Sequence, residues 1–207
     1  MAKHPSIFRG VGITKTAGLY YSSGNYHGGE DWVVNGRAKT GSAYYNDVSW
    51  YYHAPTSGTV IVSKAQRDGN KYSGFGNYVV IKCDDNYWVL MAHMKSRFVS
   101  TGDRVQQGTV IGIGGNTGNT AWSGGKNEHG TEENNPGRHL HIEVADYTKQ
   151  PKKSSYSFND FRNHVITPSN YIDFSKTGGT SNAVSVSGQI TNKSAASDWT
   201  RSVLGIK

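Results

Sequence analysis

The chain has 207 residues, of which 26 are glycine and 35% are hydrophobic, a composition typical of a turn-rich β protein of single-domain size. Its net charge of +7 predicts attraction to polyanions, but the basic residues are scattered, which argues against a specific nucleic-acid-binding protein. No apolar stretch approaches the roughly 18 residues of a membrane span, and a single cysteine excludes a disulfide scaffold.

The beginning of the chain carries one motif of interest after an unpatterned stretch. Residues 1–19 predict an irregular lead-in, and residues 1–9 lack the apolar core of a secretory signal. The string His27-Gly-Gly-Glu-Asp31 follows, and its glycine pair disfavours a helix. We therefore expect His27 and Asp31 to lie on a turn that leads into a strand, where both can approach one ion.

From Thr59 onward, short apolar runs alternate with Gly, Asn and Asp turns. These runs predict strands over residues 59–64, 77–83, 86–93, 103–106, 109–114 and 138–145. Cys83 lies in the second run, where we expect it to be buried, and Asp84-Asp-Asn86 predicts a hairpin turn. Sequential short strands without a long amphipathic helix predict a mainly β domain with an antiparallel sheet.

The last predicted strand carries a second histidine motif. Residues 138–144 read Arg-His-Leu-His-Ile-Glu-Val, and this alternation places His139, His141 and Glu143 on one face of the strand. Zinc accepts imidazole and carboxylate ligands, and a catalytic site leaves one position for water. With His27 and Asp31, this strand therefore predicts a site for one zinc ion (Zn2+). Glu143 either orients an imidazole from behind or faces solvent.

Five further motifs lie between the two histidine motifs: Ala54-Pro-Thr-Ser-Gly-Thr-Val60, Gly76-Asn-Tyr-Val-Val-Ile81, Met91-Ala-His-Met94, Gly102-Asp-Arg-Val-Gln-Gln-Gly-Thr-Val-Ile-Gly112 and Gly115-Asn-Thr-Gly118. Their order over residues 20–175 resembles the M23 (LytM/lysostaphin-type) family of zinc endopeptidases. The resemblance implies that family's antiparallel β-sheet fold. It also implies a zinc-dependent hydrolysis of bacterial peptidoglycan, in the cross-bridge or the stem peptide.

The resemblance assigns roles to five residues. His27, Asp31 and His141 match the family's three zinc ligands, while His93 and His139 match its two histidines that act on the water and the oxyanion. All five positions carry the family's residues, so the resemblance implies an active enzyme. The alternative is a catalytically inactive M23-like domain that binds cell walls or serves as a structural adapter.

Other polar and aromatic residues receive weaker roles. Tyr21 resembles a family tyrosine that contacts the tetrahedral intermediate, with Tyr20 and Tyr26 as alternatives. Some positions depart from the family pattern without touching a ligand, namely Trp32, Met91 and Met94. The histidines outside the motifs are interpreted as surface or structural residues: His4, His53, His129 and His164.

The domain is predicted to cover residues 1–175, with long groove loops near 35–52 and 122–136 that the resemblance connects with specificity. Residues 176–207 form a Ser/Thr/Gly-rich tail, which we interpret as an attachment to other virion proteins. The missing secretory signal favours a phage-encoded hydrolase, virion-associated or released by a holin. Its expected place of action is the polyanionic bacterial cell wall.

Overall fold

The computed structural model describes residues 3–35, 48–65, 74–120, 137–150 and 155–176. The predicted loops near 35–52 and 122–136 and the tail from 176 onward lie mostly outside these residues. The strands in chain order are β1 (His4–Pro5), β2 (Ile13–Ala17), β3 (Glu30–Val34), β4 (Tyr51–His53), β5 (Gly58–Ala65), β6 (Asn77–Cys83), β7 (Tyr87–Arg97), β8 (Arg104–Val105), β9 (Val110–Gly114), β10 (Leu140–Asp146), β11 (Val165–Ile166) and β12 (Ile172–Asp173). The helical segments are the 3-10 turns η1 (Val48–Trp50) and η2 (Pro168–Asn170) and the short helix α2 (Phe158–Arg162).

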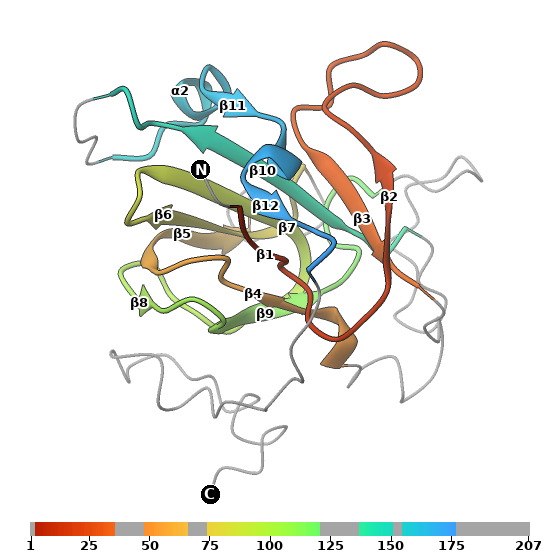
Figure 1. Ribbon diagram of the computed structural model, residues 1–207, viewed down its shortest axis with the longest axis horizontal. Helices are drawn as coiled ribbons and strands as arrows, with labels where there is room; N and C mark the ends of the chain where they lie inside the picture. The colour runs from red at the N-terminus through yellow and green to blue at the C-terminus, as the bar shows by residue number, and fades with distance from the viewer. Residues whose placement is uncertain (1–2, 36–47, 66–73, 121–136, 151–154, 177–207) are drawn as a thin grey trace, which may run out of the picture.

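One ten-stranded sheet organises the molecule (Figure 1). Its main path runs β2-β3-β10-β7-β6-β5-β8, with β11 on β10, and with β9 joining β7 to β4. Every pair within this sheet is antiparallel. The predicted fold class, a mainly β domain with an antiparallel sheet, is therefore confirmed. Among the described residues, no helix is long and apolar enough to cross a membrane.

The prediction of an irregular lead-in over residues 1–19 was wrong. β2 pairs antiparallel with β3, with Ile13 opposite Val34, and forms an edge of the sheet. β1 pairs with β12, which ties the N-terminal segment to the end of the described chain. The middle residues of β2 are Thr, Lys and Thr and are exposed, so the strand has too few apolar positions to show the alternation of a half-buried strand.

The six strands predicted from Thr59 onward are all present, β6 with the predicted bounds and the other five with shifted ends. The hairpin turn after Cys83 is confirmed, with the Asn86 amide donating to the Cys83 carbonyl at 3.1 Å, and Cys83 itself is buried. β10 begins at Leu140, so His139 lies just before the strand rather than inside it. β7 continues to Arg97, beyond the predicted end at residue 93.

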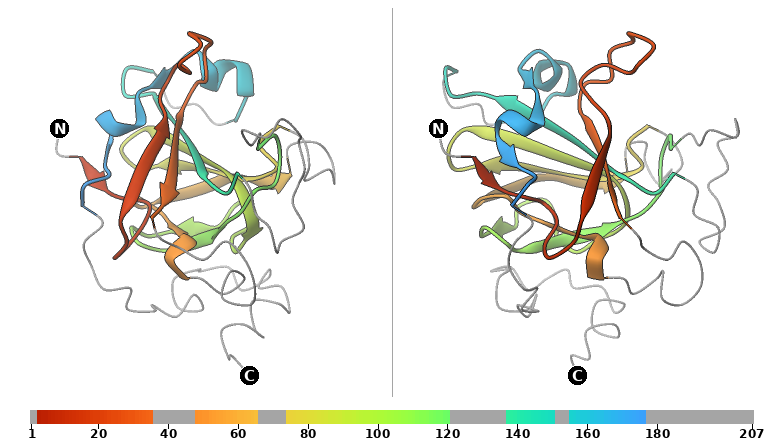
Figure 2. Two further views of the ribbon diagram at one scale, coloured as in Figure 1. Left: turned by 90° about the vertical axis from the view of Figure 1, so that its right-hand side faces the viewer. Right: turned by 45° about the vertical axis from the view of Figure 1, so that its right-hand side comes forward.

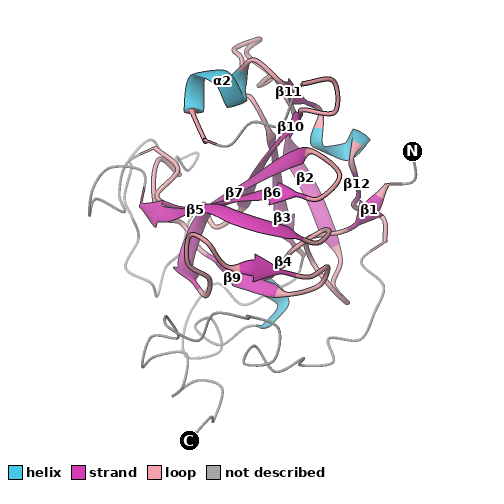
Figure 3. Ribbon diagram, turned by 90° about the vertical axis from the view of Figure 1, so that its left-hand side faces the viewer, coloured by secondary structure: helices cyan, strands magenta, loops and turns pink. Residues whose placement is uncertain are grey.

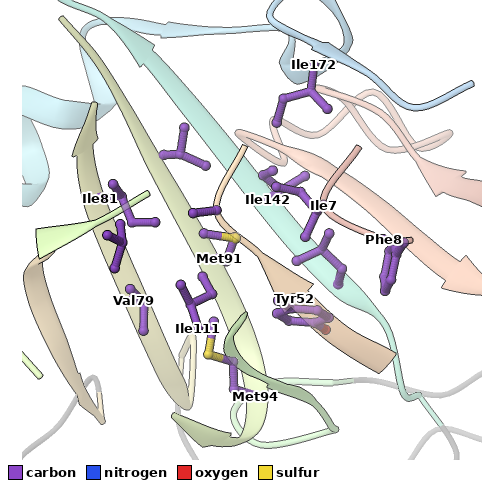
Figure 4. Close-up of a cluster of buried hydrophobic side chains, with 14 of the residues drawn as sticks. Ile7, Phe8, Tyr52, Val79, Ile81, Met91, Met94, Ile111, Ile142 and Ile172 are labelled. Carbon is purple, nitrogen blue, oxygen red and sulfur yellow. The ribbon is translucent and has the colours of Figure 1, made fainter. Parts of the chain in front are cut away.

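The central strands β6 and β7 are buried on both faces, which explains their continuous apolar runs. Figure 4 shows the larger core on one face, with Val79 and Ile81 from β6 beside Met91 from β7 and Ile142 from β10. Burying each such side chain contributes about 1.5–3 kcal/mol. Leu140, Ile142 and Val144 of β10 belong to this core, as the alternation of residues 138–144 predicts.

A second, smaller core covers the opposite face of β6 and β7 and determines where α2 lies. Val80, Trp88 and Leu90 pack there with Phe161, which is fully buried in α2. Figure 3 shows α2 at the end of the sheet where β10 and β11 lie. The connection between β2 and β3 projects from the same end (Figure 2). The β2–β3 turn and α2 therefore flank β10.

Candidate metal centre

The two histidine motifs meet through the pairing of β3 with β10. Asp31 lies directly opposite His141 in the antiparallel register. Oδ1 of Asp31 lies 2.9 Å from Nδ1 of His141 and 3.2 Å from Nε2 of His27. The ligand atoms of these three residues lie within 4.8 Å of one another. The structure thus brings together the three residues that the sequence predicts as zinc ligands.

The glycine pair of the first motif allows this close approach. Gly28 has a φ of +89°, in the left-handed region that favours glycine. A Cβ atom on Gly29 would lie 2.4 Å from the carbonyl oxygen of Ile142 and 2.9 Å from Cε1 of His141. The turn therefore presses directly against β10, and a side chain on Gly29 would push the two halves of the site apart.

The hydrogen bonds of the two ligand histidines fix which ring nitrogen faces the centre. His27 Nδ1 donates to the Gly18 carbonyl at 2.8 Å, and His141 Nε2 donates to Oε1 of Glu143 at 3.0 Å. The other nitrogen of each ring, Nε2 of His27 and Nδ1 of His141, therefore faces Oδ1 of Asp31. A metal ion that takes the place of the proton shared with Asp31 would receive one lone pair from each of the three side chains, and imidazole with carboxylate suits zinc. The residues present fit a zinc ion.

The pKa values of the ligands reflect the same arrangement. Burial alone would raise the pKa of Asp31, but hydrogen bonds from His141 and His27 outweigh it and hold that pKa far below its usual value. Burial would lower the pKa of His141, but its bonds to Asp31 and Glu143 outweigh burial and raise the pKa to about 9. An electrostatic field that favours an added proton also favours a metal ion.

His93 and His139 lie beside the three ligands, with ring centroids 4.6 Å apart. His93 Nδ1 donates to the Thr117 carbonyl and His139 Nδ1 to the Gly137 carbonyl, each at 2.7 Å. Burial lowers the pKa of both imidazoles, and the neighbouring histidines lower that of His93 further. Both rings are therefore neutral near pH 7, with Nε2 as the proton acceptor.

The Gly115–Gly118 motif explains how His93 is held. The Thr117 carbonyl accepts the hydrogen bond from the His93 ring, and the Thr117 hydroxyl donates to the Met94 carbonyl at 2.8 Å. A Cβ atom on Gly118 would lie 2.3 Å from the Gly74 carbonyl oxygen, so the motif needs glycine to pack there. His93 has a φ of +57°, which is uncommon for a residue with a side chain. Strain of this kind concentrates at functional sites.

Glu143 lies behind His141 and is fully buried. Its Oε1 accepts from His141 Nε2 and, at 2.7 Å, lies next to Nη2 of Arg162. Of the two sequence interpretations, the solvent-facing carboxylate is wrong, because α2 and its Arg162 cover Glu143. Arg162 itself was missed: it belongs to no motif, and nothing in its local sequence signals a contact with the site.

The centre lies in a pocket of about 420 Å³. Of the three candidate tyrosines, Tyr21 is among the lining residues, with its ring centroid 4.3 Å from that of His27. Tyr20 and Tyr26 instead pack against each other and are not among the lining residues. The sequence did not predict four other lining side chains, which are Phe75, Asn119, Phe158 and Arg162.

The histidines outside the motifs lie away from the centre. His4 Nε2 lies 2.8 Å from Oδ2 of Asp85, and His53 Nδ1 donates to the Ile7 carbonyl at 3.0 Å. His164 Nδ1 donates to the carbonyl of Asp160, in α2. These contacts agree with the structural roles expected of them; His129 lies outside the described residues.

A model of peptidase family M23 matches residues 38–153, more than half of the chain, and the chain therefore belongs to that family. The match begins after His27 and Asp31. No curated protein matches the chain.

Solved structures agree on the fold. Lysostaphin from Staphylococcus simulans is similar with a TM-score of 0.50 and 18% identity, over 88% of this chain and 57% of that one. Its catalytic domain is similar with a TM-score of 0.48 and 20% identity, over 78% of this chain and 91% of that one. The catalytic domain of a mutant of EnpA, a prophage-encoded M23 protein from Enterococcus faecalis, is similar with a TM-score of 0.45 and 22% identity. This match covers 72% of this chain and 94% of that one. The chain has the LytM/lysostaphin-type fold.

Proposed function

We propose that the protein is a zinc-dependent endopeptidase that hydrolyses peptide bonds of bacterial peptidoglycan. One observation carries this proposal: three ligand atoms from His27, Asp31 and His141 lie within 4.8 Å of one another, with two further histidines beside them in one pocket. Membership of peptidase family M23 supports the choice of substrate class.

The surrounding residues suit a hydrolysis at this centre. A bound zinc ion would lower the pKa of a coordinated water to about 7 and polarise the scissile carbonyl. His93 and His139 each hold their proton on Nδ1 through a carbonyl, which leaves a neutral Nε2 to accept a proton from the water and return it to the leaving amine. Tyr21 lines the pocket, and its hydroxyl would donate a hydrogen bond to the oxyanion.

An inactive M23-like domain that binds cell walls or a partner is the alternative. It would have no use for two neutral histidines fixed through Nδ1 beside a ligand set. The arrangement of His93 and His139 therefore favours an enzyme. The two functions differ in a simple observable, because an adapter binds the wall without cutting it.

Digestion of purified cell walls tests the proposal. Walls with glycine cross-bridges and walls with directly linked stem peptides are incubated with the zinc-loaded protein, and new amino termini are identified by mass spectrometry. We expect new termini in at least one wall type, absent after chelation and restored by zinc. Zinc-loaded protein that binds walls but releases no new termini from any type would overturn the proposal and favour the adapter.

The biological setting remains a prediction of the sequence. A phage-encoded, virion-associated or holin-released hydrolase and a tail over residues 176–207 that binds other virion proteins are proposals separate from the chemistry of the pocket.

A further inference from the structure

Arg162, the last residue of α2, contacts both halves of the metal centre. Its Nη2 lies 2.7 Å from Oε1 of Glu143, the same oxygen that accepts from His141 Nε2. Its Nη1 donates to the backbone carbonyl of His27 at 3.2 Å. One guanidinium thus joins the turn that carries the first ligand to the carboxylate that orients the third.

The position of Arg162 is determined by packing that does not involve the centre. Its neighbour Phe161 is fully buried in the second core, on the face of the sheet opposite the larger core. Asp160 accepts from the hydroxyl of Tyr147, just after β10, at 2.7 Å. These contacts anchor α2 independently of the ligands. The last residue of the helix, Arg162, therefore lies between β10 and the β2–β3 turn.

The turn leaves room for the guanidinium. A Cβ atom on Gly28 would lie 1.7 Å from Nη1 of Arg162 and 2.6 Å from its Cζ, so any other residue at Gly28 would collide with it. The guanidinium carbon also lies 5.1 Å from the ring centroid of Phe158 and 5.8 Å from that of Phe75. These aromatic rings exclude water from part of the guanidinium, and its side chain is only 25% exposed.

Charge and geometry both favour arginine here. Glu143 is fully buried, and a buried carboxylate needs a paired cation as well as hydrogen bonds. Arginine offers donors fixed in a planar fork, so it can contact Glu143 and the His27 carbonyl at once. A lysine at this position keeps the charge but has a single nitrogen, which cannot reproduce the two separate directions.

We propose that Arg162 is a positioning residue of the metal centre. Through Glu143 it holds the ring of His141 with Nδ1 toward Asp31, and through the His27 carbonyl it holds the β2–β3 turn against β10. This inference rests on the zinc site of the proposed function. It places part of the centre beyond residue 153, where the family match ends.

Zinc affinity tests the inference without relying on activity. Arg162→Gln, Arg162→Lys and the control Arg104→Gln are compared with wild type by competition with a chromogenic chelator. Arg104 pairs with Asp84 on the surface, where both side chains are about half exposed. We expect Arg162→Gln to raise the zinc Kd roughly 10–100-fold, the usual effect of losing such a supporting partner. The zinc Kd of Arg162→Lys should lie between those of wild type and Arg162→Gln, and the zinc Kd of Arg104→Gln should stay within about twofold of wild type.

Two further measurements separate positioning from general stability. The visible spectrum of the cobalt(II)-substituted protein reports ligand geometry and should change in Arg162→Gln but not in Arg104→Gln. In a double-mutant cycle with Glu143→Gln, the combined rise in zinc Kd should be smaller than the product of the single effects, because Arg162 acts partly through Glu143. Multiplicative effects, or an unchanged Kd and spectrum in folded Arg162→Gln, would overturn the inference.

The remaining outcomes also test the inference. If Arg162→Gln does not fold, Arg162→Lys takes its place, and a folded Arg162→Lys with wild-type zinc affinity and spectrum overturns the inference. Failure of both variants to fold would make Arg162 a residue of the fold and equally overturn it. Wild type that binds zinc but cuts no wall would refute the proposed function alone. Wild type that cuts walls, with Arg162→Gln unchanged in zinc Kd, would refute this inference alone.

Discussion

The two halves of the metal centre differ in how they are encoded. His93, His139 and His141 lie inside the segment matched by the M23 family model, whereas His27 and Asp31 lie before it. We call the first group the inner half and the second group the outer half. In the inner half, one backbone carbonyl fixes each of His93 and His139, and the carbonyl that fixes His139 belongs to Gly137, only two residues away. The outer half depends on contacts between distant segments.

Those distant contacts come from two sides. The register of β3 with β10 sets Asp31 opposite His141, and Gly29 lets the turn pack against β10. Arg162 then holds the same turn from α2. The comparison teaches that single backbone carbonyls hold His93 and His139, whereas packing between distant segments brings His27 and Asp31 to His141. Each prediction below changes one half and asks whether the other responds.

The largest effect is expected from removing one ligand of either half. Asp31→Ala and His141→Ala should each reduce bound zinc from near one equivalent to near none, because each removes one of three ligands and His141 or Asp31 remains without its partner. Metal analysis after zinc reconstitution and desalting gives the content. If Asp31→Ala keeps its zinc while His141→Ala loses it, the outer half is not part of the centre.

The next effect concerns the two histidines that are not ligands. His93→Ala and His139→Ala should bind zinc as wild type does, but lose wall hydrolysis by at least about 10²-fold, the scale of a positioned acid–base group. Zinc content and the rate of release of new amino termini are measured on the same preparations. Loss of metal from His139→Ala would make His139 a ligand, since its Nε2 lies 3.6 Å from Oδ1 of Asp31.

Both histidine motifs were predictable from sequence because their signals are local. Alternation over residues 138–144 gave the face of β10 that carries His141, and the glycines before Asp31 indicated a turn leading into a strand. β2 was missed because its exposed Thr-Lys-Thr core has no apolar repeat. Its strand conformation depends on pairing with β3, which no local pattern of residues 13–17 reports.

The contacts of α2 could not be predicted from the local sequence, for a different reason. The sequence placed Glu143 on the histidine face, but what covers that face is decided by Phe161 packing far along the chain. Arg162 is 135 residues from the His27 carbonyl that it contacts. A basic residue in a segment without a motif gives no sign of such a partner, so only the three-dimensional structure identifies it.

A smaller effect is expected from crowding the seam between the halves. Gly29→Ala would place a Cβ atom 2.4 Å from the Ile142 carbonyl oxygen, so we expect about 3 kcal/mol less free energy of unfolding and weaker zinc binding. Gly12→Ala is the matched control, because its Cβ atom would meet only Asn35, at an ordinary contact distance of 3.4 Å. Urea unfolding and chelator competition measure both variants. Equal behaviour of the two would show that the seam is loosely packed.

The smallest effect concerns His53, a buried histidine of the matched segment that lies outside the centre. Burial, with the nearby charge of Arg9, lowers its pKa from 6.5 to about 4, although its bond to the Ile7 carbonyl acts in the opposite direction. The unfolded chain therefore binds a proton at this residue between pH 6.5 and 4 that the folded chain does not.

Stability from His53 is thus fully present above pH 6.5 and is lost as the pH falls toward 4. Wild type should lose about 1.4 kcal/mol more free energy of unfolding per pH unit in this range than His53→Gln does. Urea titrations at pH 7.5, 6.0 and 5.0 give the difference, and any release of zinc in acid is common to both proteins. Parallel pH profiles would mean that the folded protein protonates His53 as readily as the unfolded chain. The acid sensitivity of the protein would then come from the metal centre rather than from the surrounding core.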